Sequence, residues 1–409
     1  MLNTPLAPWP NYTQEEADAV QKVLLSNQVN YWTGNEGHNF ETEFAAWAGS
    51  QHAIALANGT VALEIALHAL DIGPGDEVIV SPRTFLASVS SIIQVGAKPI
   101  FADVDLNSQN ITADTIAAML TPDTRAILCV HLAGWPCDMA PIMDLASQHQ
   151  LKVIEDCAQA HGARYQSQSV GTIGDIGCWS FCQDKIMTTG GEGGMVTTND
   201  EALWRTMWAR KDHGKNYAAV HEREHPPGFR WLHEDFGTNA RMTEMQAAIG
   251  RIQLQRMPEW TRCRTTHAAA LTHALTPYAG HNGCIRLTPF HCHHDSPAYT
   301  QDNVHAYYKY YCFVRPENLA PDWNRDRVID AINAAGVPCY VGSCSEVYLE
   351  KAFDDTSYRP AQRLPNARTL GDTSLMFLVH PTLTSAEINK TTHVITSVLQ
   401  QASSAVTSA

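Results

Sequence analysis

The sequence predicts an α/β protein in which a large domain with a mostly parallel sheet precedes a smaller α+β domain. Between about residues 52 and 200, short β-rich runs alternate with helical segments, as in strand–helix–strand units around a parallel sheet. After residue 240 the chain begins with a long helical stretch and continues with one aromatic strand and two further helices. We therefore expect residues 1–260 to form an N-terminal segment with the large domain, and residues 261–409 to form the small domain.

The expected elements of the large domain follow one another in a regular order. Thr13 is a suitable N-cap for a helix that runs to Leu25, and residues 39–47 carry apolar side chains at helical spacing. Strands are expected at 53–57, 76–82, 98–104, 126–134, 152–158, 178–181 and 193–199, and helices among them at 59–70 and 85–96.

Fewer elements are expected in the small domain. A helix over about 241–275 leads into it, and an aromatic strand follows at 307–316. A helix then ends at Gly336, and a final helix begins near Thr384.

The charge balance and the hydropathy exclude several classes of protein. The chain carries 28 Lys and Arg against 42 Asp and Glu, and no basic run that would bind a nucleic-acid backbone. No segment reaches 18 uncharged apolar residues, so we expect no membrane span, and the N-terminus lacks the pattern of a signal peptide. We therefore expect a cytoplasmic protein whose eleven cysteines are reduced thiols.

Two features at the ends of expected strands are suited to a charged ligand. Asn58, Gly59 and Thr60 lie between a strand and a helix, where free N–H groups and the helix dipole favour an anion such as phosphate. Taken alone, this segment is also explained by a glycine turn with a threonine cap. The strand at 152–158 contains Glu155 and Asp156 at the edge of the sheet where ligands bind. A carboxylate there can hold a protonated ring nitrogen, or it can be a helix cap or an exposed acid.

Two further residues complete a recognisable set. Lys185, the only lysine between residues 153 and 210, lies between an aromatic strand and a glycine-rich turn. Burial lowers the pKa of a lysine and makes its amine a nucleophile, although most lysines lie on the surface. Phe85 follows the strand at 76–82, where an aromatic ring can stack on a planar ligand or pack in the core. A phosphate, a ring nitrogen, a ring face and a carbonyl that meets a lysine together describe pyridoxal 5′-phosphate (PLP).

The segments around these residues resemble the DegT/DnrJ/EryC1/StrS family of PLP-dependent sugar aminotransferases, within the fold-type-I aminotransferase superfamily. The resemblance covers about residues 30 to 260 in family order and is looser beyond them. The matching segments are ANGTVALEIALHAL, IGPGDEVIVSPRTFLAS, GAKPIFADVD, VHLAGWP, VIEDCAQAHGARY, VGTIGDIGCWSF, the Lys185 run that ends in GGEGGMVTTND, and FGTNARMTEMQAAIGRIQL.

The resemblance implies a fold-type-I transferase with a large α/β/α sandwich domain, which forms a homodimer with two shared active sites. It implies that Lys185 forms a Schiff base with PLP and that Asp156 pairs with the pyridine nitrogen. Gln159 would lie near the ring and its phenolic oxygen, and Phe85 would stack on the ring. The phosphate would be bound by Gly59, Thr60 and Ser180 and by Asn239 of the neighbouring subunit.

The implied activity is transfer of an amino group from an amino acid, glutamate in most relatives, to a keto sugar. The sugar is usually linked to a nucleotide and is used in glycan or deoxyamino-sugar biosynthesis. Some relatives are PLP- or PMP-dependent sugar dehydratases that lack the Schiff-base lysine, so Lys185 favours transamination. A cyclitol aminotransferase and a non-catalytic PLP-binding regulator remain alternatives, although no DNA-binding segment accompanies the second.

Three features depart from the family pattern or suggest other chemistry. Arg83 stands where relatives often carry a small or aromatic residue, and it could bind a substrate carboxylate or phosphate or form a surface pair. The segment 337–348 stands where many relatives have a histidine-containing loop near the substrate. The run 291–295 (HCHHD) contains residue types that bind metals, but neighbouring residues of one loop cannot all reach one ion, so we expect no metal site.

Overall fold

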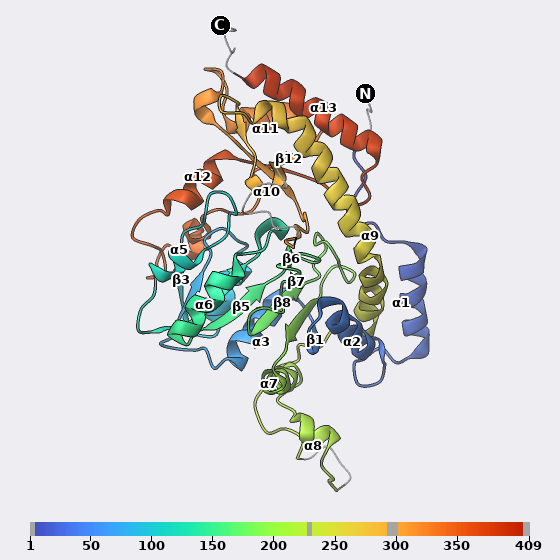
Figure 1. Ribbon diagram of the computed structural model, residues 1–409. Helices are drawn as coiled ribbons and strands as arrows, with labels where there is room; N and C mark the ends of the chain where they lie inside the picture. The colour runs from blue at the N-terminus through green and yellow to red at the C-terminus, as the bar shows by residue number, and fades with distance from the viewer. Residues whose placement is uncertain (1–4, 227–230, 293–301, 404–409) are drawn as a thin grey trace.

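A seven-stranded sheet lies at the centre of the larger part of the protein (Figure 1). The structure is a computed structural model that describes residues 5–226, 231–292 and 302–403. The strand order is β1-β9-β8-β5-β4-β2-β3, and only β9 runs antiparallel to its neighbours. This confirms the predicted mostly parallel sheet. The strands are β1 (His52–Leu56), β2 (Glu77–Val80), β3 (Lys98–Phe101), β4 (Thr124–Val130), β5 (Lys152–Asp156), β8 (Ile176–Ser180) and β9 (Gly194–Thr198).

Helices cover both faces of this sheet because successive side chains of each strand point to opposite sides. In β2, Val78 and Val80 belong to one core with the helices α3, α4 and α7, whereas Ile79 belongs to another with α5 and α6. The result is the α/β/α sandwich that the family resemblance implied. The helices of this part are α1 (Gln14–Ser26), α2 (Glu36–Ala48), α3 (Gly59–Ala69), α4 (Ala87–Gln94), α5 (Ala113–Ala117), α6 (Met139–His149), α7 (Glu201–Lys211) and α8 (Tyr217–His221), with a short hairpin of β6 (Arg164–Tyr165) and β7 (Gln168–Ser169).

The helix ends follow the sequence signals. Thr13 caps α1, and its backbone N–H donates to the Glu16 carboxylate at 2.6 Å. Thr384 caps the last helix in the same way, since its N–H donates to Glu387 and the Glu387 N–H donates back to its hydroxyl. Both predicted helix starts are confirmed.

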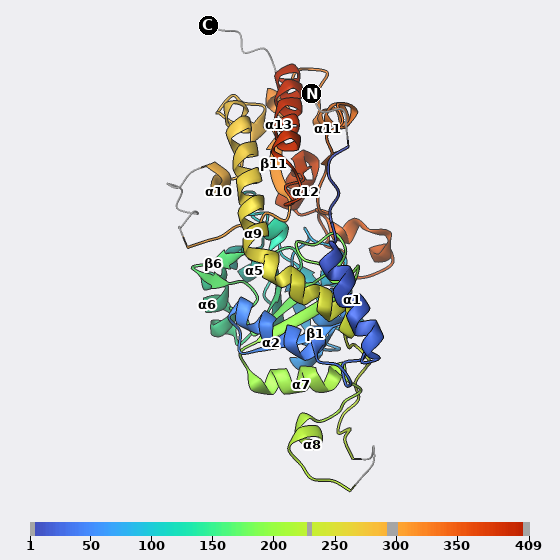
Figure 2. The same cartoon turned by 90° about the vertical axis from the view of Figure 1, so that its right-hand side faces the viewer.

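One long helix, α9 (Glu244–Leu275), runs from the large domain into the small one (Figure 2). Its first half packs in a core with α2, through Ala247, Leu254 and Met257. Its second half packs in the core of the small domain, through Ala268 and Leu271. The domain boundary at residue 260 therefore falls within this helix, between the two cores, and stays a prediction.

The small domain is a four-stranded antiparallel sheet, in the order β10-β11-β13-β12, with helices packed against it. All five residues of β11 are buried, because Cys312 faces the small-domain core while Tyr311 and Phe313 pack in a core of the large domain. This strand therefore joins the two domains. The elements of the small domain are β10 (Ile285–Arg286), α10 (Pro289–Cys292), β11 (Tyr310–Val314), α11 (Arg325–Ala334), β12 (Cys339–Tyr340), α12 (Pro365–Thr373), β13 (Ser374–Phe377) and α13 (Ser385–Ala402). Single 3₁₀ turns lie at Leu132–Gly134 in the large domain and further along the chain at Thr276–Tyr278, Pro316–Asn318, Val347–Leu349 and Lys351–Phe353.

An arm that carries α8 projects from the large domain at the end away from the small domain (Figures 1 and 2). It leaves after α7 and returns to the body at Ala240, whose carbonyl accepts a hydrogen bond from Ala57. Within the described parts of the chain, no helix has both the length and the apolar character needed to cross a membrane.

Candidate active site

A cavity of about 640 Å³ opens at the carboxyl edge of the parallel sheet. The strands β1, β2, β5 and β8 end there, which is where ligands bind in open α/β sheets. The cavity brings together most of the residues that the sequence singled out. Those in its lining are Gly59, Thr60, Phe85, Asp156, Gln159, Ser180 and Lys185.

Asn239 is the exception among the expected site residues. It lies at the base of the projecting arm, its side chain is exposed, and it is not part of the cavity lining. Its expected role toward a neighbouring subunit stays a prediction.

Asp156 ends β5 and is held at both carboxylate oxygens. The Ser88 hydroxyl donates to Oδ2 at 2.7 Å, and the Ala158 N–H donates to Oδ1 at 3.1 Å. The hydroxyl of Thr84 lies 2.8 Å from that of Ser88 and extends the chain of hydrogen bonds. The carboxylate is therefore fixed in orientation in a nearly buried position. The sequence analysis did not identify Ser88. It lies four residues after Thr84, a spacing that brings the two hydroxyls to the same side of the chain where it turns into α4.

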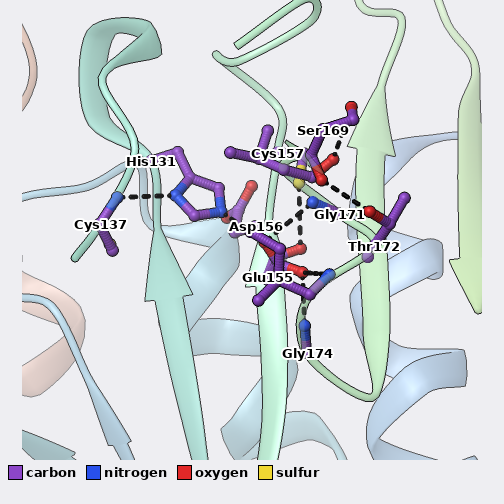
Figure 3. A network of polar contacts seen from close by, with 12 residues as sticks. His131, Cys137, Glu155, Asp156, Cys157, Ser169, Gly171, Thr172 and Gly174 are labelled. Carbon is purple, nitrogen blue, oxygen red and sulfur yellow. Dashed lines mark hydrogen bonds and ion pairs between the residues drawn. The ribbon is translucent and has the colours of Figure 1, made fainter. Parts of the chain in front are cut away.

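Glu155 is fully buried and anchors the strand that carries Asp156 (Figure 3). Its carboxylate lies 3.0 Å from His131 Nε2 and accepts backbone N–H groups of Gly171, Ile173 and Gly174 at 2.7–2.8 Å. Burial alone would raise the pKa of Glu155, but the hydrogen bonds from His131 and the backbone lower it below its usual range.

The same cluster is a metal candidate by residue type, because ligand atoms of His131, Glu155 and Cys157 lie within 4.8 Å of one another. Its hydrogen bonds argue against a metal. His131 Nδ1 accepts the Cys137 N–H, so the ring proton is on Nε2 and points to Glu155. The Glu155 oxygens in turn accept hydrogen bonds from backbone N–H groups, so the cluster has a structural role: it joins β5 to the loop before β8. In the run 291–295, which we expected to bind no metal, residues 293–295 lie outside the described residues.

Lys185 lies in the turn between β8 and β9 and lines the cavity. Its Nζ is 3.8 Å from Asp184 Oδ1 and 5.4 Å from the centroid of the Tyr308 ring. The Tyr308 hydroxyl donates a hydrogen bond to Asp184. The Trp9 indole N–H donates to the Lys185 carbonyl at 2.8 Å, so the N-terminal segment fixes this turn. Sequence reasoning missed Trp9 because the contact joins segments 176 residues apart.

The N-terminus of α3 faces the same cavity. Asn58 caps the helix by accepting the Val61 N–H at 2.9 Å, and the first N–H groups of a helix have no partner within it. A Cβ on Gly59 would come within 2.6 Å of the Ser180 Cβ, so only glycine fits between the helix and β8. This gives the cavity an anion site beside the Ser180 hydroxyl.

Gln159 and Phe85 complete the lining. The side-chain oxygen of Gln159 accepts the Ala133 N–H at 2.8 Å, which leaves its NH₂ group as a donor. Phe85 is 71% exposed, so it does not pack in the core, and its ring is available to a ligand in the cavity.

A second cavity, of about 710 Å³, adjoins the first and shares Lys185 and Gln159 with it. The segment 340–344 of the small domain lines it, so the loop that departs from the family pattern does lie beside Lys185.

Arg83 lies behind this second cavity. It is fully buried, so the surface pair that the sequence left open is wrong. Its Nε donates to Gln109 at 3.1 Å, its Nη1 and Nη2 have no partner among the described residues, and burial lowers its pKa.

Comparisons with known proteins agree with this geometry. A model of the DegT/DnrJ/EryC1/StrS aminotransferase family matches residues 10–398. The chain belongs to this family. Its aminotransferases are PLP-dependent, and the cavity fits PLP, because a fixed carboxylate, a lysine amine and an anion site meet in it.

Individual relatives give the same picture. An aminotransferase from Psychrobacter cryohalolentis, known from its X-ray structure, has 62% sequence identity to this chain. The two structures superpose with a TM-score of 0.95 over 97% of this chain and 100% of that one. A UDP-N-acetyl-3-dehydro-alpha-D-glucosamine 3-aminotransferase of Acidithiobacillus ferrooxidans is 44% identical over 57% of this chain. A GDP-perosamine synthase of Caulobacter vibrioides is also 44% identical over 57%. The matches span 60% and 61% of the lengths of these two enzymes.

Proposed function

We propose that this protein is a PLP-dependent aminotransferase that moves an amino group from an amino acid, with glutamate the expected donor, to a nucleotide-linked keto sugar. The observation that carries the proposal is the presence of the Lys185 amine and the fixed Asp156 carboxylate in one cavity. The sugar-nucleotide enzymes among the relatives support the acceptor class. The product would serve glycan or deoxyamino-sugar biosynthesis.

Asp156 would hold the proton on the pyridine nitrogen of PLP. When bound, PLP supplies an electron sink for the pair of electrons released at the α-carbon of the donor. Asp156 is held in one orientation because the Ser88 hydroxyl and the Ala158 N–H each donate a hydrogen bond to its carboxylate. Gly59, Thr60 and Ser180 would hold the phosphate at the start of α3.

Lys185 would carry PLP at rest and move the proton during the reaction. Its Nζ would accept the proton from the α-carbon of the donor and later deliver one to the acceptor carbon. The Trp9 contact and the Cys182 carbonyl, which accepts the Lys185 N–H at 3.1 Å, fix the backbone from which this side chain works. A flexible side chain on a fixed backbone suits a group that must swing between two positions.

We also infer that the protein is a homodimer with two shared active sites. Asn239 and the projecting arm support this, because neither contributes to the lining of the cavity of their own chain. The arm exposes Trp231 and Phe236, which are 72% and 91% accessible in the single chain. Light scattering would give twice the 45.1 kDa chain mass, and Asn239→Ala would weaken PLP binding. A monomer that binds PLP and is fully active would overturn this inference.

The deciding experiment is an absorbance spectrum of the PLP-loaded protein before and after glutamate. A yellow band that shifts to the shorter-wavelength pyridoxamine form would establish the first half-reaction. A panel of nucleotide-linked keto sugars would then identify the acceptor, since the true acceptor restores the yellow band. A band that no amino acid changes would overturn the proposal.

A further inference from the structure

A second lysine faces the cavity beside Lys185. Lys309 lies in the small domain, directly before β11, and lines the second cavity together with Lys185, Asp184 and Tyr308. Its Nζ is 4.8 Å from the centroid of the Tyr308 ring, and the Lys185 Nζ is 5.4 Å from the same centroid. The two amines, one from each domain, thus share an aromatic neighbour.

Lys309 has no counter-ion of its own in the parts of the chain that the structure describes. Among the described residues, none forms a hydrogen bond with its ammonium group, and no carboxylate oxygen comes within 4.0 Å of Nζ. The nearest candidate is Asp184, which already accepts the Tyr308 hydroxyl and lies 3.8 Å from the Lys185 Nζ. Among the described residues, Lys309 is therefore the one cation lining the second cavity that has no counter-ion.

The surroundings of Lys309 make this lack of a partner unfavourable. Burial lowers the pKa of Lys309 to about 8, with help from the positive charges of Arg264 and Lys185 and against the attraction of Asp184. At neutral pH most molecules still carry the charge. A half-buried ammonium without a partner is destabilising, and an anion that enters the cavity would relieve the cost.

We propose that Lys309 binds the carboxylate of the amino donor, an inference that rests on the proposed aminotransferase function. In an amino acid the carboxyl carbon is bonded to the carbon that bears the transferred amine. Any donor that reacts at Lys185 therefore brings a carboxylate into the cavity that Lys185 and Lys309 both line. In a keto sugar the reacting carbon is bonded to two ring carbons, so no carboxylate is attached directly to it.

A comparison of the two half-reactions distinguishes a role of Lys309 in donor binding from a general effect on the active site. Lys309→Met is expected to slow the conversion of the yellow form by glutamate about 10- to 100-fold at low glutamate, because a charge-assisted contact is lost. The return reaction with the keto sugar should change less than about twofold. Lys309→Arg, which keeps the charge, should recover much of the donor reaction. Lys351→Met, an exposed lysine of the small domain, is the matched control.

A binding measurement without turnover provides a second readout. Glutarate has the two carboxylates of glutamate but no amine, so it can bind to the PLP-loaded enzyme without reacting. Calorimetry should show binding to the wild-type protein and at least about tenfold weaker binding to Lys309→Met.

The outcomes distinguish this inference from the proposed function. If the wild-type protein shows no PLP band, or no amino acid changes it, the proposed function itself fails. If the wild-type protein reacts and Lys309→Met reacts equally fast, or binds glutarate equally well, the donor site is overturned. Equal slowing of both half-reactions would also overturn it, since Lys309 would then only position Tyr308 and Lys185.

Discussion

The charged groups on the two sides of the active site differ in how many hydrogen-bond partners they have. At the end of β5, Glu155 has four donors and Asp156 has two, so these carboxylates are fixed before any ligand arrives. Toward the small domain, the Lys309 ammonium has no hydrogen-bond partner among the described residues, and the guanidinium of buried Arg83 has one, Gln109.

This contrast indicates which groups form the permanent structure of the site and which groups bind the substrates that enter and leave it. A buried charge without a partner is destabilising, so the paired carboxylates of Glu155 and Asp156 can be permanent parts of the site, and we call them its floor. An unpaired charge that faces a cavity is suited to a ligand that carries the missing partner and then leaves. In an enzyme that keeps its cofactor and exchanges its substrates, the permanent pairs belong on the cofactor side.

Removal of Lys185 should have the largest effect. Lys185→Ala is expected to abolish transamination and the absorbance band of lysine-bound PLP, because no other described lysine lines the first cavity. The variant should still bind PLP through the floor and the start of α3, measured after dialysis against the cofactor. Lys152→Ala, at the opposite edge of the sheet, is a matched control that should behave as the wild type. Full turnover by the Lys185 variant would refute the assignment.

The second prediction removes the charge from the floor. Asp156→Asn keeps the size of the side chain but cannot stabilise a protonated pyridine nitrogen. The rate of the glutamate half-reaction should fall about 10²- to 10³-fold, the usual effect of losing one preorganised electrostatic group. Stopped-flow absorbance on the PLP-loaded variant measures this rate. A rate near that of the wild type would show that Asp156 is only a structural acid.

The sequence alone predicted most of the fold and singled out Asp156 and Lys185, which the structure brings into one cavity. The strands of the large domain were predictable because their apolar runs are bounded by glycine, proline and charged residues, as at 76–82, where β2 spans Glu77–Val80. The helix α7 was not predicted, since it buries only Met207, Trp208 and Lys211 and has no continuous apolar stripe. Lys185 and Asp156 stand in local segments whose residues can be interpreted without knowledge of the rest of the chain.

The other side of the site could not be predicted in this way. Lys309 is one of several polar residues in an aromatic strand, and only the packing of the two domains brings it beside Lys185. Ser88 and Asp156 are 68 residues apart, and no pattern within either segment indicates their contact. The burial of Arg83 likewise depends on Tyr311, whose ring centroid lies 5.6 Å from the guanidinium carbon.

The third prediction concerns Glu155 and stability. Glu155→Gln would place an NH₂ group against backbone N–H donors and should destabilise the fold by about 3 kcal/mol or more. The folded-state pKa of Glu155 is lowered, so its contribution is full above its unfolded pKa of about 4.3 and is lost as the pH falls through the folded value. The thermal midpoint of the variant should therefore lie well below the wild type at pH 7. The gap should narrow in acid, and a gap that is constant with pH would contradict the lowered pKa.

The smallest effect is expected at Arg83, and it tests the contrast most directly. Arg83→Met removes a buried guanidinium whose one hydrogen-bond partner among the described residues is Gln109. Replacement of poorly paired buried charges by apolar groups is often neutral or stabilising. Its thermal midpoint should equal or exceed that of the wild type. Arg264 is the matched comparison, since it is equally buried but donates to the carbonyls of Tyr307 and Tyr308. Arg264→Met leaves both carbonyls without that donor, so its midpoint should fall by a few degrees. If Arg83→Met destabilises the protein more than Arg264→Met, Arg83 belongs to the permanent framework and the contrast does not extend to it.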